Sequence, residues 1–152
     1  MGRTARVREN GDVADAHLPP AGTGAVVLFD GTCAFCEASV KFIARRDPAG
    51  YFRFGASQTS AAAAILAAHG INRESARSLV LIEDGAVYLR STASLRVARR
   101  LVWPWRLFAV FLIVPAPLRD PFYRVVAAVR HRLAGRSHAC EIAPPEIRDR
   151  LI

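Results

Sequence analysis

The sequence predicts an α/β domain in which helices flank a four-stranded mixed sheet, with a helical extension at the C-terminal end. Short apolar runs such as Ala25–Phe29 alternate with longer segments whose apolar residues recur at helical spacing. A helix between two neighbouring strands makes those strands parallel. The Asp84-Gly85 dipeptide between two apolar runs indicates a tight hairpin, and therefore an antiparallel strand as well.

The expected elements follow in the order β-α-β-α-β-β-α, and a further helix ends the chain. Asp47-Pro48 and Gly70 end the first two helices, because proline disfavours helix at the residue before it and glycine is a common C-terminal stop. Ser91 or Thr92 is expected to cap the third helix. This order is that of a thioredoxin-like fold. Strands are predicted at residues 25–29, 51–54, 78–82 and 86–89, and helices at 33–46, 58–69, 91–102 and 118–134.

Two apolar segments lie in the C-terminal half. The segment from Leu101 to Leu118 contains Arg106 and three prolines, and its uninterrupted part is far shorter than the roughly 20 residues that span a membrane. We expect it to form a buried helix or an apolar wall. The helix that follows carries one apolar stripe, made of Phe122, Val125, Val126, Val129 and Leu133.

Residues 1–24 are predicted to be a flexible tail and residues 25–152 a single domain. The net charge of +8 is uneven, because residues 90–136 hold ten arginines and a single acid, Asp120. We interpret these arginines as the solvated outer faces of helices. Specific nucleic-acid binding is not expected, since no base-stacking motif accompanies them, and contact with a membrane surface is a less favoured interpretation.

Three cysteines are too few for a secreted scaffold held together by disulfides. The charged first ten residues precede no apolar segment and so do not fit a secretory signal. We therefore expect a cytoplasmic location, where a dithiol stays reduced unless it is turning over.

Two of the cysteines, Cys33 and Cys36, lie one helical turn apart, where the first strand leads into the first helix. The thiolate is the nucleophile in disulfide exchange, and the N–H groups at a helix N-terminus stabilise a thiolate. Cys33 is therefore expected to attack a disulfide, and Cys36, expected to be the deeper of the two, to resolve the mixed disulfide. Asp30 is expected either to handle the proton of Cys36 or to hold the loop through backbone N–H groups.

Asp30, Cys33 and Cys36 form a DxxCxxC motif, and the chain resembles the DCC family of thiol-disulfide oxidoreductase-like proteins over about residues 25–151. Further matching pieces are Phe52-Arg53-Phe54, Ser91-Thr92-Ala93 and a C-terminal run that includes Tyr123, Arg130-His131-Arg132 and Cys140.

The resemblance implies a thioredoxin-like fold and a protein-disulfide reductase or related activity, with a disulfide-containing protein or a small-molecule thiol as substrate. No cofactor beyond the cysteine pair is expected. Gly31, Thr32 and Phe35 of the motif loop are expected to support the site. Ser78 is expected to do so as well. Arg77-Ser78 stands where thioredoxins have a cis-proline, so the chain departs from thioredoxins at this point.

Cys140 is the third cysteine, and we interpret it as a small buried side chain, with a role as a third redox thiol as the alternative. Cys33, Cys36, His138 and Cys140 together would suit tetrahedral zinc, so a non-enzymatic zinc-binding module is the alternative function. The Cys33–Cys36 pair and the His138–Cys140 pair are far apart in the sequence, whereas a structural zinc site usually holds short loops together. The predicted domain also has a hydrophobic core of its own. No metal is therefore expected.

Overall fold

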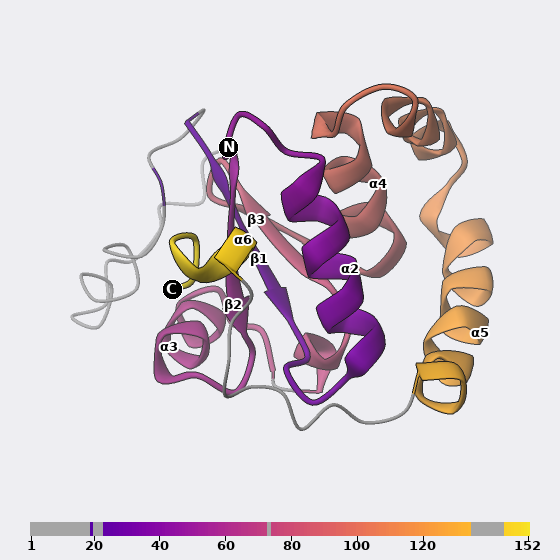
Figure 1. Cartoon of the computed structure of the whole chain (residues 1–152). Helices are drawn as coiled ribbons and strands as arrows, with labels where there is room; N and C mark the ends of the chain where they lie inside the picture. The colour runs from indigo at the N-terminus through magenta and orange to yellow at the C-terminus, as the bar shows by residue number, and fades with distance from the viewer. Residues whose placement is uncertain (1–18, 20–22, 73, 135–144) are drawn as a thin grey trace, which may run out of the picture.

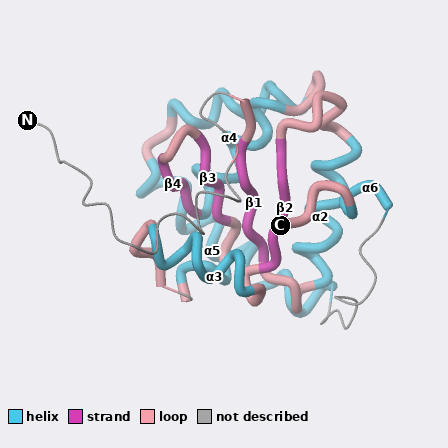
Figure 2. The backbone as a smooth tube through the Cα atoms, turned by 90° about the vertical axis from the view of Figure 1, so that its left-hand side faces the viewer, coloured by secondary structure: helices cyan, strands magenta, loops and turns pink. Residues whose placement is uncertain are grey.

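Four strands form one mixed sheet in the order β2-β1-β3-β4 (Figures 1 and 2). The computed structural model describes residue 19 and residues 23–72, 74–134 and 145–152. β1 pairs in parallel with β2 and antiparallel with β3, and β3 pairs antiparallel with β4. The predicted mixed sheet is confirmed. The strands are β1 (Ala25–Phe29), β2 (Phe52–Ala56), β3 (Val80–Glu83) and β4 (Ala86–Leu89).

Helices cover both faces of this sheet, as Figure 1 shows. Alternate residues of β1 point to opposite faces, because side chains alternate along a strand. Val27 packs in the cluster formed with α2 (Ala34–Arg45) and α4 (Arg90–Arg100). Val26 packs in the second cluster, with α3 (Ser60–Ala68). The predicted α/β architecture with helices on both faces is confirmed.

The C-terminal half adds elements to the outer side of α2 and α4. The 3₁₀ helix η2 (Trp105–Ile113) packs on α4, and α5 (Ala116–Ala134) contacts both α2 and α4. α5 lies outside the sheet layers (Figure 1). The short α6 (Pro145–Arg148) packs on α2, and Leu151 pairs in parallel with Phe54 at the β2 edge.

Six of the predicted element starts differ from the observed ones by one or two residues, and two of these differences have a clear structural cause. α4 begins at Arg90 with Leu89 as its N-cap, so neither Ser91 nor Thr92 caps it. The hydroxyl of Ser91 donates instead to Asp120 on α5, at 2.6 Å, which ties the two helices together. β3 begins at Val80, because Ser78 ends the short 3₁₀ helix η1 (Ser75–Arg77) that precedes the strand.

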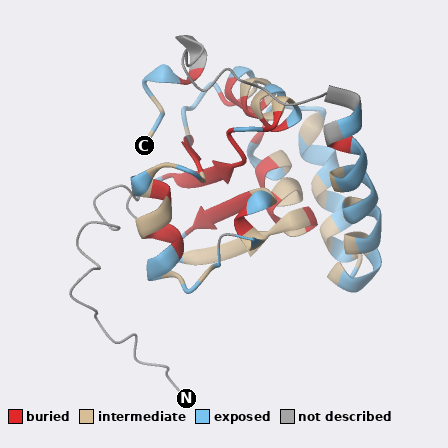
Figure 3. Ribbon diagram, turned by 90° about the horizontal axis from the view of Figure 1, so that it is seen from below, coloured by how far each residue is buried: buried red, intermediate tan, exposed pale blue. Residues whose placement is uncertain are grey.

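The apolar stripe of α5 faces outward over much of its length. Phe122 is 76% exposed and Val125 61%, and Figure 3 shows how little of α5 is buried compared with the strands. η2 has no buried residue, so the segment from Leu101 to Leu118 is an apolar wall and not a buried helix. The side chain of Leu133 and most of the predicted tail, residues 1–24, lie outside the described residues. That domain boundary stays a prediction.

Candidate active site

The cysteine pair lies where β1 leads into α2. A turn follows β1, closed by the Cys33 N–H donating to the Asp30 carbonyl at 3.2 Å. Cys33 is the N-cap of α2, and Cys36 lies in its first turn, so one turn of helix brings the two thiols together. Both are free thiols, and a hydrogen bond joins their side chains. This confirms the predicted placement of the pair at a strand-to-helix junction.

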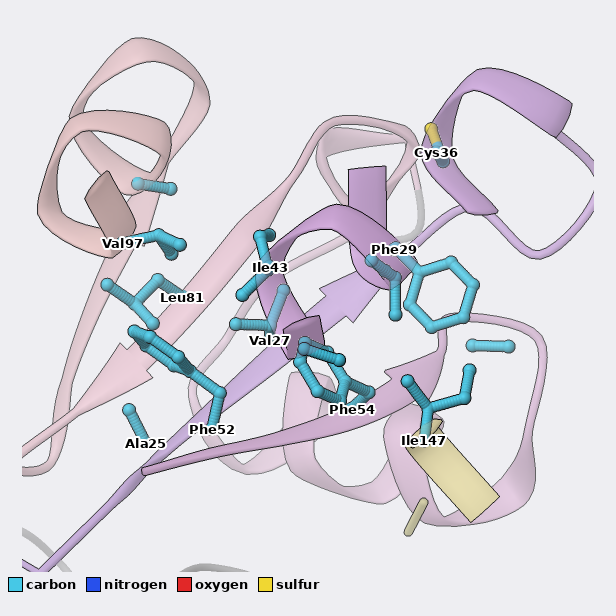
Figure 4. Close-up of a cluster of buried hydrophobic side chains, with 14 of the residues drawn as sticks. Ala25, Val27, Phe29, Cys36, Ile43, Phe52, Phe54, Leu81, Val97 and Ile147 are labelled. Atoms are coloured by element: carbon cyan, nitrogen blue, oxygen red, sulfur yellow. The ribbon is translucent and has the colours of Figure 1, made fainter. Parts of the chain in front are cut away.

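The two thiols differ in exposure, in the order opposite to the expected one. Cys33 is fully buried among the core residues, whereas Cys36 is 8% exposed and lies in the wall of a cavity. Figure 4 shows Cys36 at one end of the buried apolar cluster. The expectation that Cys36 is the deeper thiol is therefore wrong, because one turn of α2 carries its side chain from the core to the cavity.

The cavity beside Cys36 has a volume of about 980 Å³ and lies among α2, α4, η2 and α5. Phe35 of the motif lines it and is 41% exposed, and its supporting role stays a prediction. Trp105 also lines the cavity and packs edge-on against Phe42, with ring centroids 4.7 Å apart. Trp103, in contrast, is 75% exposed and does not line it. The thiol of Cys36 thus faces a largely apolar space.

A buried arginine from α5 completes the surroundings of Cys36. Arg130 donates through Nη1 to Cys36 Sγ at 3.5 Å and through Nη2 to the Arg77 carbonyl at 2.7 Å. It is 8% exposed and makes no ion pair with a carboxylate in the described part of the chain. A guanidinium stays charged at all relevant pH values. Arg130 therefore supplies a positive charge beside the Cys36 sulfur.

The surroundings of Cys36 favour its protonated form. Burial, followed by the hydrogen bond with Cys33, raises the pKa of Cys36 to about 12, and the Asp30 carboxylate adds a smaller effect in the same direction. The charge of Arg130 acts in the opposite direction and lowers this pKa. At neutral pH Cys36 is therefore a protonated thiol.

Asp30 holds the loop that precedes the pair. Its Oδ1 accepts from the Thr32 N–H at 2.9 Å, the Thr32 hydroxyl at 2.7 Å and the Gln58 side-chain amide at 2.9 Å. Burial by itself raises the pKa of Asp30, but these hydrogen bonds outweigh it and the pKa lies below 3.8. Asp30 is therefore an anion at neutral pH, and its bonds favour the loop-holding interpretation over proton handling.

The family model that matches the chain is the DCC1-like thiol-disulfide oxidoreductase, over residues 27–136. The chain belongs to this family. It is 40% identical over 127 residues to the uncharacterized protein YuxK of Bacillus subtilis, covering 84% of this chain and 93% of that protein. It is 35% identical over 118 residues to a chloroplastic DCC family protein of Arabidopsis thaliana, covering 77% and 69% of the two chains. No solved structure matches the chain.

Two residues of this DCC family member, Arg130 and Gln58, join the site although motif reasoning gave them no role there. Gln58, just after β2, accepts from the Gly31 N–H at 3.1 Å and donates to Asp30. Arg130 lies 94 residues after Cys36, in the C-terminal run that matches the family. Neither contact is local, so no spacing in the sequence signals it.

Ser78 lies near the site, but its hydroxyl is used elsewhere. It donates to the Ser75 carbonyl at 2.7 Å and not to the cysteine pair. The contribution from this stretch comes from its neighbour Arg77, whose carbonyl holds Arg130. A supporting role for Ser78 stays a prediction.

The alternative zinc site depends on residues beyond the described ones. Cys140 and His138 both lie outside them. Among the residues that the structure describes, no group of three or more histidine, cysteine or acidic side chains is placed to hold a metal ion. Zinc binding and a redox role for Cys140 therefore stay untested hypotheses.

Within the described residues, no helix is both long and apolar enough to cross a membrane. The Arabidopsis relative is chloroplastic by its name, so membership of the family does not fix a compartment. The cytoplasmic location stays a prediction.

Proposed function

We propose that this DCC family member is an enzyme that exchanges disulfides through Cys33 and Cys36. The observation that carries the proposal is the setting of Cys36, whose thiol lines a cavity, bonds to Cys33 and lies 3.5 Å from the Arg130 guanidinium. Two neighbouring thiols beside an accessible space, one of them held protonated, suit two-step exchange. The family's own description as thiol-disulfide oxidoreductases supports the same activity.

In the proposed reaction Cys33 attacks first. The attacking species is a thiolate, and Cys36 is unsuited to this step because its pKa is raised to about 12. Cys33 lies at the N-terminus of α2, where the N–H groups of the first turn favour a negative charge. Its attack breaks the substrate S–S bond and joins one substrate sulfur to Cys33. The other substrate sulfur leaves and takes up a proton.

Cys36 then resolves the mixed disulfide. Once Cys33 is bonded to substrate, its hydrogen bond with the Cys36 thiol is lost. One cause of the raised Cys36 pKa is then removed. Arg130 stabilises the Cys36 thiolate that forms. Attack on Cys33 Sγ closes the Cys33–Cys36 disulfide and releases the second substrate thiol. The substrate gains two electrons and two protons, and the protein dithiol loses them.

The burial of Cys33 opposes this order of attack. Cys33 is fully buried whereas Cys36 faces the cavity, so a substrate in the cavity meets the Cys36 sulfur first. Attack by Cys33 therefore requires a movement that opens its sulfur to the cavity. The order of the two steps can be measured separately from the activity itself.

Trapping the mixed disulfide tests both the activity and the order. Reduced protein in a Cys140→Ser background is mixed with excess hydroxyethyl disulfide. The free thiols are then alkylated, and the mass of the protein is measured by mass spectrometry. The protein that keeps both Cys33 and Cys36 should form an internal disulfide and so lose both alkylation sites. Cys36→Ser should accumulate a mixed disulfide on Cys33, while Cys33→Ser should react slowly. Faster trapping on Cys36 would reverse the order, and an unreactive pair would refute the activity.

A further inference from the structure

The cavity beside Cys36 is walled by helices, and its surface is almost entirely apolar. Its volume of about 980 Å³ lies at the upper end of the roughly 300–1,000 Å³ of small-molecule sites. Aromatic and aliphatic side chains from α2, α4, η2 and α5 form the wall, so an occupant gains by burying apolar surface. Representative residues of this wall are Phe35, Phe42, Leu95, Phe108, Phe111 and Phe122.

The polar groups in this wall are mostly engaged with the protein. The hydroxyls of Ser39, Ser91 and Ser94 donate to Phe35, Asp120 and Arg90 oxygens respectively, and the Tyr123 hydroxyl accepts from the Leu79 N–H. The wall offers no strand edge, and helix backbone groups bond within their own helix. An extended polypeptide would leave many of its own N–H and C=O groups unpaired here. The wall therefore favours a molecule without a peptide backbone.

Arg119, at the start of α5, is an unmatched cation in this wall. Its Nη2 donates to the Thr92 hydroxyl at 3.1 Å, but its buried Nε and Nη1 have no hydrogen-bond partner in the described structure. The neighbouring Asp120 is engaged by Ser91 and Arg90 and makes no ion pair with Arg119. Buried donors without partners are costly, and a carboxylate satisfies two guanidinium N–H groups at once. Both nitrogens are closed to solvent, so a carboxylate in the cavity reaches them only when the Arg119 side chain turns toward it, and it then gives this cation an anionic partner.

The distance between Arg119 and the cysteine pair sets the length of the occupant. Arg119 and Arg130 are eleven residues apart on one helix, so their Cα atoms lie about 16 Å apart along its axis. Arg130 contacts Cys36, and Arg119 lines the same cavity about three turns earlier on α5. An extended ligand with its anion at Arg119 can therefore bring its other end to Cys36.

We propose that this cavity is a substrate site for a small amphiphilic disulfide. The apolar chain lies along the wall, a carboxylate pairs with Arg119, and the S–S bond reaches the Cys33–Cys36 pair. The assignment rests on the disulfide exchange proposed above and names its substrate class. The ligand's S–S bond breaks and takes up two electrons and two protons to give two thiols, while Cys33 and Cys36 form the new S–S bond.

The test uses chemically matched disulfides with the reduced protein. The symmetric disulfide of ω-mercaptoundecanoic acid carries the carboxylate, and that of ω-mercaptoundecanol lacks it. The symmetric disulfide of mercaptopropionic acid has the charge without the chain length. Oxidation of the pair is followed by quenched alkylation at increasing disulfide concentration, below the micellar range. The long carboxylate disulfide should reach its half-maximal rate at a concentration about tenfold lower than the long alcohol, equivalent to about 1.4 kcal/mol.

Variants on α5 separate a specific pairing from general charge. Arg119→Met should raise the half-saturating concentration of the long carboxylate disulfide by about tenfold, leave the alcohol unchanged and keep the maximal rate. Arg119→Lys should restore part of the preference. Arg124→Met, which removes an exposed arginine of the same helix outside the cavity, should behave as wild type.

Two kinds of failure are distinguishable. Three results would overturn the amphiphilic substrate site while the exchange activity stands. The long acid and the long alcohol would reach half-maximal rate at the same concentration, Arg124→Met would have the same effect as Arg119→Met, or the short acid would be used as well as the long acid. If neutral hydroxyethyl disulfide also fails to oxidise the pair, the exchange activity itself is refuted, and the substrate assignment falls with it.

Discussion

Replacing Arg130 with methionine removes the cation that donates to Cys36 and keeps much of the buried side-chain volume. Arg130 lies 3.5 Å from Cys36 Sγ and lowers the pKa of that thiol. In the proposed mechanism this matters only when Cys36 must become a thiolate. Arg130→Met should therefore slow resolution of the mixed disulfide and leave the first attack by Cys33 nearly unchanged.

The size of this effect follows from the contact. At 3.5 Å and an effective dielectric constant of about 20, two unit charges attract by about 4–5 kcal/mol, which is an upper bound. Hydrogen bonds to charged groups contribute about 1.5–3 kcal/mol, and sulfur is a weak acceptor, so the lower end applies. Since about 1.4 kcal/mol corresponds to a tenfold change, resolution should slow by roughly tenfold.

The assay is a single turnover in which the release of the two substrate thiols is resolved in time. Reduced protein is mixed with a disulfide and samples are quenched with an alkylating agent, so that the mixed disulfide is counted by mass. Arg130→Met should accumulate this species, and Arg130→Lys, which keeps the charge, should accumulate less. The role assigned to Arg130 would be refuted if Arg130→Met resolved the mixed disulfide at the wild-type rate, or if only the rate of the first attack fell.

Other predictions concern the loop and the chain end. Folding lowers the pKa of Asp30, so its ionised carboxylate stabilises the fold above the unfolded pKa of about 4, and this stabilisation is lost as pH falls through the folded pKa. The melting temperature of Asp30→Asn should therefore be lower than that of wild type at pH 7, and the two melting temperatures should converge in acid. Gln58→Met removes bonds to Gly31 and Asp30 and should cost about 1–3 kcal/mol in urea unfolding, whereas no cost would argue against its place in the loop. Arg150→Met leaves the buried Asp47 carboxylate without its ion pair and should cost about 3–5 kcal/mol, and an unchanged midpoint would contradict this pairing.

Local sequence signals predicted most of the fold. β1 and β4 match the predicted residues, because an apolar run and the Asp84-Gly85 turn define them without help from distant contacts. Both turn residues have positive φ, 53° at Asp84 and 74° at Gly85, as a tight hairpin needs. The start of α4 was missed because the Ser91 hydroxyl bonds to Asp120 on α5, a partner that capping rules do not consider.

The site was predicted only as far as its local part. The DxxCxxC spacing placed Cys33 and Cys36 at the strand-to-helix junction, and the sequence left Asp30 with two roles, of which its hydrogen bonds favour loop holding. Arg130 was not assigned to the site, because its contact with Cys36 depends on how α5 docks against α2. The order of exposure was wrong for a similar reason. The cavity that opens Cys36 is formed by α4, η2 and α5, which lie far along the chain.

In the proposed function Cys33 and Cys36 form a reversible redox pair, and thiol–disulfide equilibration tests this property most directly. The Cys140→Ser protein is incubated in graded mixtures of reduced and oxidised glutathione and then alkylated. The number of alkylated cysteines is measured by mass spectrometry. We expect one two-electron transition, in which Cys33 and Cys36 lose their alkylation sites together and regain them on reduction. A pair that stays fully alkylated across the series, or that forms only separate glutathione adducts, would contradict the account.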